Sequence, residues 1–214
     1  MNIFSSANNW EEAYSLIDKA LENLGITGPE TAFKRDGETW RELYILKHGL
    51  KVSLQKRSVS WPITIEKRES PDFIIHTNLK HYGVEVTEAI SEEDARERSI
   101  FVKSEAEAIA LGTFGGAQVM GPQVAAKNRT QQIQNAITKK TKLIENYNVS
   151  TDLLIYPTGN NVLYCCPEDI ATIEAYYKTI ENHKYHNQIS NSNVWIVWDD
   201  RSPFHIKHNA ASLS

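Results

Sequence analysis

The sequence predicts an α/β fold in which a mixed β-sheet is flanked by helices. Short runs rich in β-branched and aromatic residues, typical of strands, alternate with longer segments of helical periodicity. Several extended runs follow the first two helical segments, and the rest of the chain alternates helix and strand. Such an order indicates a sheet with helices packed on its faces.

The first half of the chain contains two predicted helices and four predicted extended segments. The first helix, residues 9–24, has Trp10, Ala13, Ile17 and Leu21 on one face, and Gly25 would end it. The second helix surrounds Trp40 and reaches residue 47. The extended segments are residues 50–54, 63–67, 72–75 and 83–89.

The second half is predicted to alternate helix and strand. A charged helix would run over residues 91–111, and the glycines of residues 112–121 would form a loop. An amphipathic segment without Gly or Pro, residues 125–147, predicts a further helix. The remaining predicted elements are strands at 152–156, 162–166 and 194–198, and a helix at 167–183 that Pro167 opens.

The chain of 214 residues is long enough to bury a sizeable core as a single domain, residues 1–214. Its core would cover about 40–157, preceded by the helix at 9–24 and followed by a β-α-β extension at 158–199. No apolar run reaches the length of a membrane span, and residues 1–6 show no secretory signal. The adjacent cysteines Cys165 and Cys166 match no zinc motif, which favours a reduced, cytoplasmic setting.

Two acids interrupt neighbouring strands. Asp72 starts the run 72–75, and Glu85 lies inside 83–89. The polar residues 76–82 between them suit a hairpin, so the strands should pair and the two acids could lie side by side. Buried carboxylates are costly unless paired or bound to metal, and two that converge suit Mg²⁺ or Mn²⁺. Glu85 could instead face water, because it alternates with Val84 and Val86.

A lysine on the apolar face of the helix 125–147 favours the site over a solvated face. With Ile133 as the origin and about 100° per residue, Lys140 lies at about −20°, within the apolar stripe. Its neighbours Lys139 and Lys142 fall on the outer face, where charged residues of a surface helix belong. Snorkelling is the alternative. A lysine in the centre of the stripe is expected to reach a carboxylate or a substrate anion.

These residues together resemble the PD-(D/E)XK nuclease superfamily, the restriction endonuclease-like proteins. Pro71-Asp72, then Glu85-Val86-Thr87, then helical Lys140 stand in the order of its motif, over roughly residues 72–155. The usual motif has its lysine two positions after the second acid, where this chain has Thr87. Lys140 is similar to the variant whose lysine comes from the following helix. The resemblance implies an αβββαβ core.

The resemblance also implies roles for the residues. Asp72, Glu85 and the Val86 carbonyl would bind Mg²⁺ or Mn²⁺, and Lys140 would act on the attacking water or the phosphoryl charge. Thr87 could hydrogen-bond a metal-bound water. Glu69 and Glu42 are optional further acids, each better explained as a surface glutamate than as a ligand. The implied activity is endonucleolytic cleavage of nucleic acid, with DNA favoured over RNA.

Charge provides mixed information about partners. The formal net charge of −4 argues against a strongly basic nucleic-acid binder. Basic residues nevertheless gather on the predicted helix 125–147, where they could contact phosphates. These residues are Lys127, Arg129, Lys139 and Lys142. A homodimer would suit cleavage of both strands of a duplex.

Two alternatives stay open. One is a catalytically inactive PD-(D/E)XK-like binding module, with Thr87 marking the lost chemistry. The other is a hydrolase built on histidines, in which His76 and His81 join Asp72 in a transition-metal site.

Overall fold

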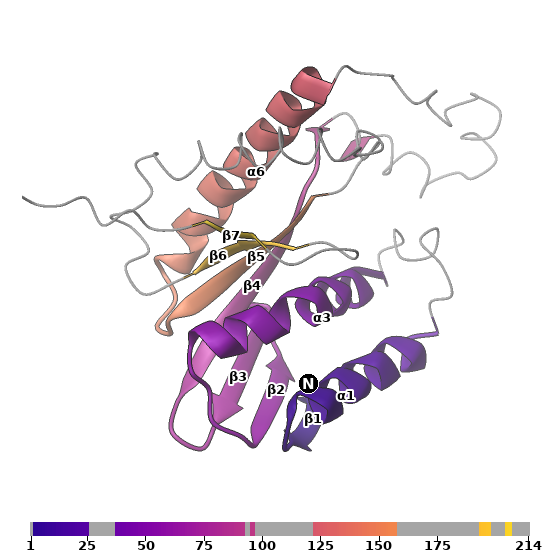
Figure 1. Cartoon of the computed structure of the whole chain (residues 1–214), viewed down its shortest axis with the longest axis vertical. Helices are drawn as coiled ribbons and strands as arrows, with labels where there is room; N and C mark the ends of the chain where they lie inside the picture. Colours follow the sequence, from indigo (N-terminus) through magenta and orange to yellow (C-terminus); the bar gives the residue numbers. More distant parts are fainter. Residues whose placement is uncertain are drawn as a thin grey trace, which may run out of the picture.

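In the computed structural model of the chain, the residues described are 2–25, 37–92, 95–96, 122–157, 193–197 and 204–206 (Figure 1). Within them, seven strands form one sheet, and their spatial order is their order in the sequence. The strands are β1 (Asn2–Ala7), β2 (Ile63–Lys67), β3 (Phe73–Thr77), β4 (His81–Ala89), β5 (Thr151–Pro157), β6 (Val194–Ile196) and β7 (Phe204–Ile206).

The sheet is mixed, which confirms the predicted α/β class. Strands β1 to β4 pair antiparallel, β5 and β6 join parallel to β4, and β7 closes the order antiparallel to β6. The parallel step from β4 to β5 requires a crossover, and a helix supplies it. The carboxyl ends of β2, β4 and β5 therefore lie at the same edge of the sheet as the start of β3.

Helices cover both faces of the sheet (Figure 1). On one face, α1 (Trp10–Asn23) and α3 (Glu38–Lys56) share a core with Val84 and Val86 of β4. On the other face, α6 (Pro122–Ile144) packs on Leu153 and Ile155 of β5. Since side chains alternate along a strand, Glu85 must face α6.

The helix α3 is longer than predicted, and the prediction of an extended segment at 50–54 was wrong. Leu50, Val52 and Leu54 alternate as in a strand, but Leu46, Leu50 and Leu54 also repeat at helical spacing, and these three are buried. Gly49 brings the helix close to β5, because a Cβ there would lie 2.5 Å from Leu154 Cδ1. The close packing of this segment against the sheet therefore favours a helix over a strand at residues 50–54.

Most of the other predicted helices and strands that fall within the described residues were confirmed. The predicted helices at 9–24 and 125–147 and the strands at 63–67, 72–75, 83–89 and 152–156 are confirmed, with ends shifted by a few residues. The strands β1 and β7 were missed. The predicted elements at 162–166 and 167–183, most of 91–111, the loop at 112–121 and both cysteines lie outside the described residues. No helix of the described segments has the length and apolar character that crossing a membrane requires.

Candidate active site

The two acids lie across from each other at the junction of β3 and β4. Phe73 pairs with Val84, so the antiparallel register, continued by one residue, places Asp72 opposite Glu85. Both acids are buried, at 7% and 2% exposure. The Asp72 amide donates to Glu85 Oε2 at 3.3 Å, and the Val86 amide donates to Asp72 Oδ2 at 2.8 Å. The expected convergence of the two carboxylates is confirmed.

Lys140 points into this pair rather than into solvent. Its Nζ donates to Glu85 Oε1 at 2.5 Å, and its side chain is 20% exposed. Lys139 and Lys142 are exposed on the outer face of α6. The position follows from packing, because buried Ile133, Ile137 and Ile144 hold the same face of α6 on the sheet. The predicted direction of Lys140 is therefore confirmed.

Tyr147 completes the environment of Glu85. Its hydroxyl donates to Glu85 Oε2 at 3.0 Å, so both oxygens of this carboxylate accept hydrogen bonds. The sequence analysis ended the predicted helix at residue 147 without assigning Tyr147 to the site. Its spacing of seven residues from Lys140, two helical turns, was the signal that could have identified it.

A second lysine reaches the site from the opposite face of the sheet, and the sequence reasoning did not identify it. Lys67 ends β2 next to Phe73, which packs in the core beneath α3. Its Nζ lies 2.7 Å from Glu42 Oε2 on α3 and 3.9 Å from Asp72 Oδ1. Glu42 is thus a half-buried residue beside the carboxylate pair rather than a surface glutamate.

The electrostatics of the pair are unfavourable without a cation. Burial, followed by the negative charges of Glu85 and Glu42, raises the pKa of Asp72 to about 7, against the lowering effects of the Val86 amide and of Lys140. Burial, followed by the charge of Glu85, likewise raises the pKa of Tyr147 to about 12, which keeps its hydroxyl a donor. A divalent cation would relieve the repulsion between Asp72 and Glu85.

The donor set suits a hard cation that keeps part of its hydration shell. Across the described ranges, no group of three or more Asp, Glu, His or Cys side chains is arranged to hold a metal ion. The carboxylates of Asp72 and Glu85 remain, and Mg²⁺ is commonly bound by one or two carboxylates with water and substrate oxygens. Asp72 and Glu85 therefore fit Mg²⁺ or Mn²⁺.

The other candidate ligands differ in placement. Thr87 faces α6 on the same side of β4 as Glu85, is half-buried, and its hydroxyl donates to the Glu88 carbonyl at 3.4 Å. Glu69 is exposed in the turn before Asp72. Val86 contacts the site through its amide. The metal-binding roles expected of Thr87, Glu69 and the Val86 carbonyl stay predictions.

The basic residues of α6 separate into two groups. Lys127, Lys139 and Lys142 are exposed, as a contact with phosphate requires. Arg129 is only 6% exposed, so the expectation that it faces a nucleic acid was wrong. It lies at about −40° from Ile133, on the sheet-facing stripe of the helix.

The histidine site is not supported by the structure. His76 lies near the end of β3, four residues from Asp72, a separation of about 13 Å along a strand. It pairs with His81 across the hairpin, and its Nε2 lies 3.1 Å from Glu66 Oε2. The site proposed from His76, His81 and Asp72 was therefore wrong.

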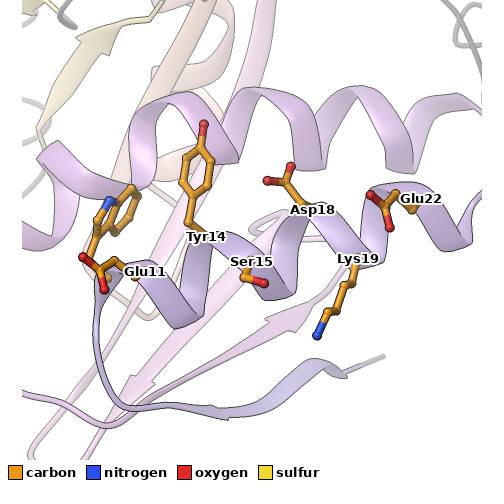
Figure 2. Close-up of a pocket in the computed structure, with 7 residues that line it drawn as sticks. Glu11, Tyr14, Ser15, Asp18, Lys19 and Glu22 are labelled. Atoms are coloured by element: carbon orange, nitrogen blue, oxygen red, sulfur yellow. The ribbon is translucent and has the colours of Figure 1, made fainter.

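A shallow hollow along α1 is separate from this site (Figure 2). It is lined by Trp10, Glu11, Tyr14, Ser15, Asp18, Lys19 and Glu22. Among the described residues, none of these hydrogen-bonds or ion-pairs with Asp72, Glu85 or Lys140. The candidate chemistry therefore belongs to the carboxylate pair.

Comparison with known proteins leaves these residues as the basis for assigning a function. The chain matches no protein-family model, no curated protein and no solved structure at a significant level.

Proposed function

We propose that this chain is a metal-dependent endonuclease of the PD-(D/E)XK type that hydrolyses phosphodiester bonds, with DNA favoured over RNA. One observation carries the proposal. The Lys140 ammonium, from a helix 55 residues further along the chain, is bonded to Glu85 directly across the strand pair from Asp72. Two buried acids and a half-buried lysine at one point indicate chemistry, because withdrawing three ionisable groups from water is costly for stability alone.

The order of elements also supports the proposal. Among the described residues, α3 is followed by β2, β3, β4, α6 and β5, an order of helix, three strands, helix and strand. The resemblance implies an αβββαβ core of this kind. Asp72 directly precedes the second strand of this series and Glu85 lies within the third, in agreement with the motif.

Asp72 and Glu85 would hold the Mg²⁺ or Mn²⁺ ion, with the Val86 carbonyl as a further oxygen donor. When bound, the cation lowers the pKa of a coordinated water and polarises the scissile phosphate. Tyr147 and the Asp72 amide hold Glu85 in place through Oε2. Lys140, bonded to Glu85 Oε1, is placed to orient the attacking water or to stabilise charge on phosphoryl oxygens.

The substrate would be held by the exposed basic residues of α6. Lys127, Lys139 and Lys142 can contact phosphates without entering the carboxylate pair. Binding that depends on such contacts weakens as salt increases. A homodimer is part of the same proposal, because cleavage of both strands of a duplex favours two-fold symmetry. A cytoplasmic location is also proposed, from the adjacent cysteines Cys165 and Cys166.

Incubation with circular DNA, linear DNA and RNA tests the proposal. We expect cleavage with Mn²⁺ or Mg²⁺, none with EDTA, and loss of cleavage in Glu85→Ala. Lys140→Ala should lower turnover by about 10²–10³-fold, as for removal of one preorganised donor. Lys139→Ala is the matched control, because it removes the adjacent charge from the outer face of the helix.

Equal losses in Lys140→Ala and Lys139→Ala would show that only general positive charge matters. Intact substrates at every concentration of metal would contradict the endonuclease assignment.

A catalytically inactive binding module is the second candidate, and the environment of Glu85 favours it. Lys140 and Tyr147 already bond both oxygens of this carboxylate, so an internal ion pair could replace the metal permanently. Thr87 in the usual lysine position agrees with this reading. A titration with Mn²⁺ separates the two functions, because the module would bind no metal while the nuclease would bind it at the carboxylate pair.

A further inference from the structure

The ammonium group of Lys67, at the end of β2, makes several contacts within the protein. Its Nζ is 2.7 Å from Glu42 Oε2 and donates to the Arg68 carbonyl at 2.7 Å. The same atom lies 5.2 Å from the centre of the Phe73 ring. Its side chain is 16% exposed, as is that of Glu42. These contacts fix the ammonium in place on the α3 side of the sheet.

Lys67 lies between two acidic side chains, those of Glu42 and Asp72. Its Nζ is 2.7 Å from one carboxylate and 3.9 Å from the Oδ1 atom of Asp72, the other. Asp72 Oδ2 instead accepts from the Val86 amide at 2.8 Å. The two oxygens of Asp72 thus face different groups, with Oδ1 toward Lys67 and Oδ2 toward β4.

Each of the two lysines of the site pairs with a different acid. Three carboxylates, Glu42, Asp72 and Glu85, lie beside two ammonium groups, Lys67 and Lys140. Lys140 hydrogen-bonds Glu85 from the α6 side, and Lys67 forms an ion pair with Glu42 from the α3 side. One negative charge remains, centred on Asp72, so a single divalent cation would leave the site with a charge of +1 that suits an anionic phosphodiester.

We propose that Lys67 sets the metal stoichiometry of the site: its ammonium occupies the space between Glu42 and Asp72 that a second divalent cation would need, so the site binds one Mg²⁺ or Mn²⁺. The inference rests on the proposed metal site at Asp72 and Glu85. In sites with two metals the ions lie about 3.5–4 Å apart and share a carboxylate. Asp72 is the acid they would share, and Lys67 faces its Oδ1 at 3.9 Å.

Electrostatics reinforces this exclusion. A dication and an ammonium so close together repel strongly, because the Coulomb energy increases as the distance falls and a half-buried pair is screened less than one in water. A second ion could therefore bind only if Lys67 left its place, which would break its ion pair with Glu42 and its hydrogen bond to the Arg68 carbonyl. Removing the charge while keeping the side-chain stem should open the second position.

Counting bound Mn²⁺ at saturation, by calorimetry and by the signal of free Mn²⁺ in electron paramagnetic resonance, tests the inference. We expect one ion in the wild-type chain and two in Lys67→Met. Lys67→Gln is a second neutral variant, to be used if Lys67→Met fails to fold. The double variant Glu42→Gln/Lys67→Met should return to one ion, because the acid that completes the second position is gone.

Lys140→Met is the matched control, since it removes the same charge from the same site and should still bind one ion. A count of two in wild type, or of one in both neutral Lys67 variants, would overturn the inference while leaving the metal site intact. A count of two in Lys140→Met would overturn it as well, because general charge would then explain the change. No binding in any variant would instead overturn the proposed function.

Discussion

At the scale of single residues, the buried position of Asp72 suits the proposed binding of a metal ion but lowers the stability of the metal-free chain. Burial and the charge of Glu85 raise its pKa to about 7, so above that pH the folded chain holds an unfavourable charge. Each unit of raised pKa corresponds to about 1.4 kcal/mol. We expect Asp72→Asn to raise the free energy of unfolding of the metal-free chain at pH 8 by about 1–3 kcal/mol, measured by urea denaturation.

Asp152 provides the matched control, because it is a buried acid and both of its carboxylate oxygens accept hydrogen bonds. It accepts from Arg57, from Ser53 at 2.6 Å and from the Asn193 amide at 3.0 Å. Asp152→Asn should lower stability by about 3 kcal/mol, since it removes the carboxylate charge that pairs with Arg57. If both variants changed stability in the same direction, Asp72 would not be a strained acid.

Tyr147 should act as a positioning residue for Glu85. Its hydroxyl donates to Glu85 Oε2 at 3.0 Å, so Tyr147→Phe removes a constraint without changing charge. We expect about 10–100-fold weaker Mn²⁺ binding, as is typical when a group that orients a ligand is lost. Tyr14→Phe, on α1, is the control and should bind Mn²⁺ normally. Unchanged affinity in Tyr147→Phe would show that the bond is only structural.

At the scale of elements, β4 holds the segment that carries Asp72. A Cβ added at Gly83 would lie 2.7 Å from Pro71 Cγ, and it would also meet the Thr151 side chain. We expect Gly83→Ala to displace Pro71 and with it Asp72, costing about 1–3 kcal/mol of stability and weakening Mn²⁺ binding. Calorimetry of metal binding beside thermal unfolding measures both effects.

Gly49→Ala is the control for this prediction. Its added Cβ would meet Leu154 at the contact between α3 and β5, away from Pro71. Metal affinity should stay normal in this variant whatever happens to its stability. A loss of affinity in Gly49→Ala equal to that in Gly83→Ala would mean that loosened packing, rather than the position of Asp72, controls binding.

At the scale of the whole molecule, the raised pKa of Asp72 makes stability depend on pH. Between about pH 4 and pH 7 the unfolded chain has lost this proton while the folded chain retains it, so stability falls as pH rises. Glu66 acts in the opposite sense, because hydrogen bonds from Arg68 and His76 lower its pKa. The comparison with Asp72→Asn isolates the contribution of Asp72.

We therefore expect the melting temperature of the wild-type chain to fall relative to Asp72→Asn from pH 4 to pH 7 and to differ by a constant amount above that range. Saturating Mn²⁺ should remove the fall in the wild type and leave the variant unaffected, because a ligand that binds only the folded state stabilises it. A constant difference over the entire range would contradict the raised pKa.

Much of the candidate site could be predicted from local patterns. Alternation along β4 separates Glu85 from Val84 and Val86, and helical periodicity puts Lys140 on the buried face of α6. Both patterns depend on backbone geometry within one element. Arg129 lies on the same stripe as Lys140, so the same periodicity indicated that it is buried, and the expectation of a phosphate contact rested on its charge alone.

By itself, the sequence determined the α/β class, the antiparallel pairing of the two acid-bearing strands, the separation of Glu85 from Val84 and Val86, and the face of its helix on which Lys140 lies. Only the tertiary structure decided that Lys67 and Glu42 meet beside Asp72, that Tyr147 bonds Glu85, and that residues 50–54 continue α3. Periodicity tells which side of an element a residue occupies. It does not tell which distant side chain arrives there, because that depends on how helices and strands pack across the sheet.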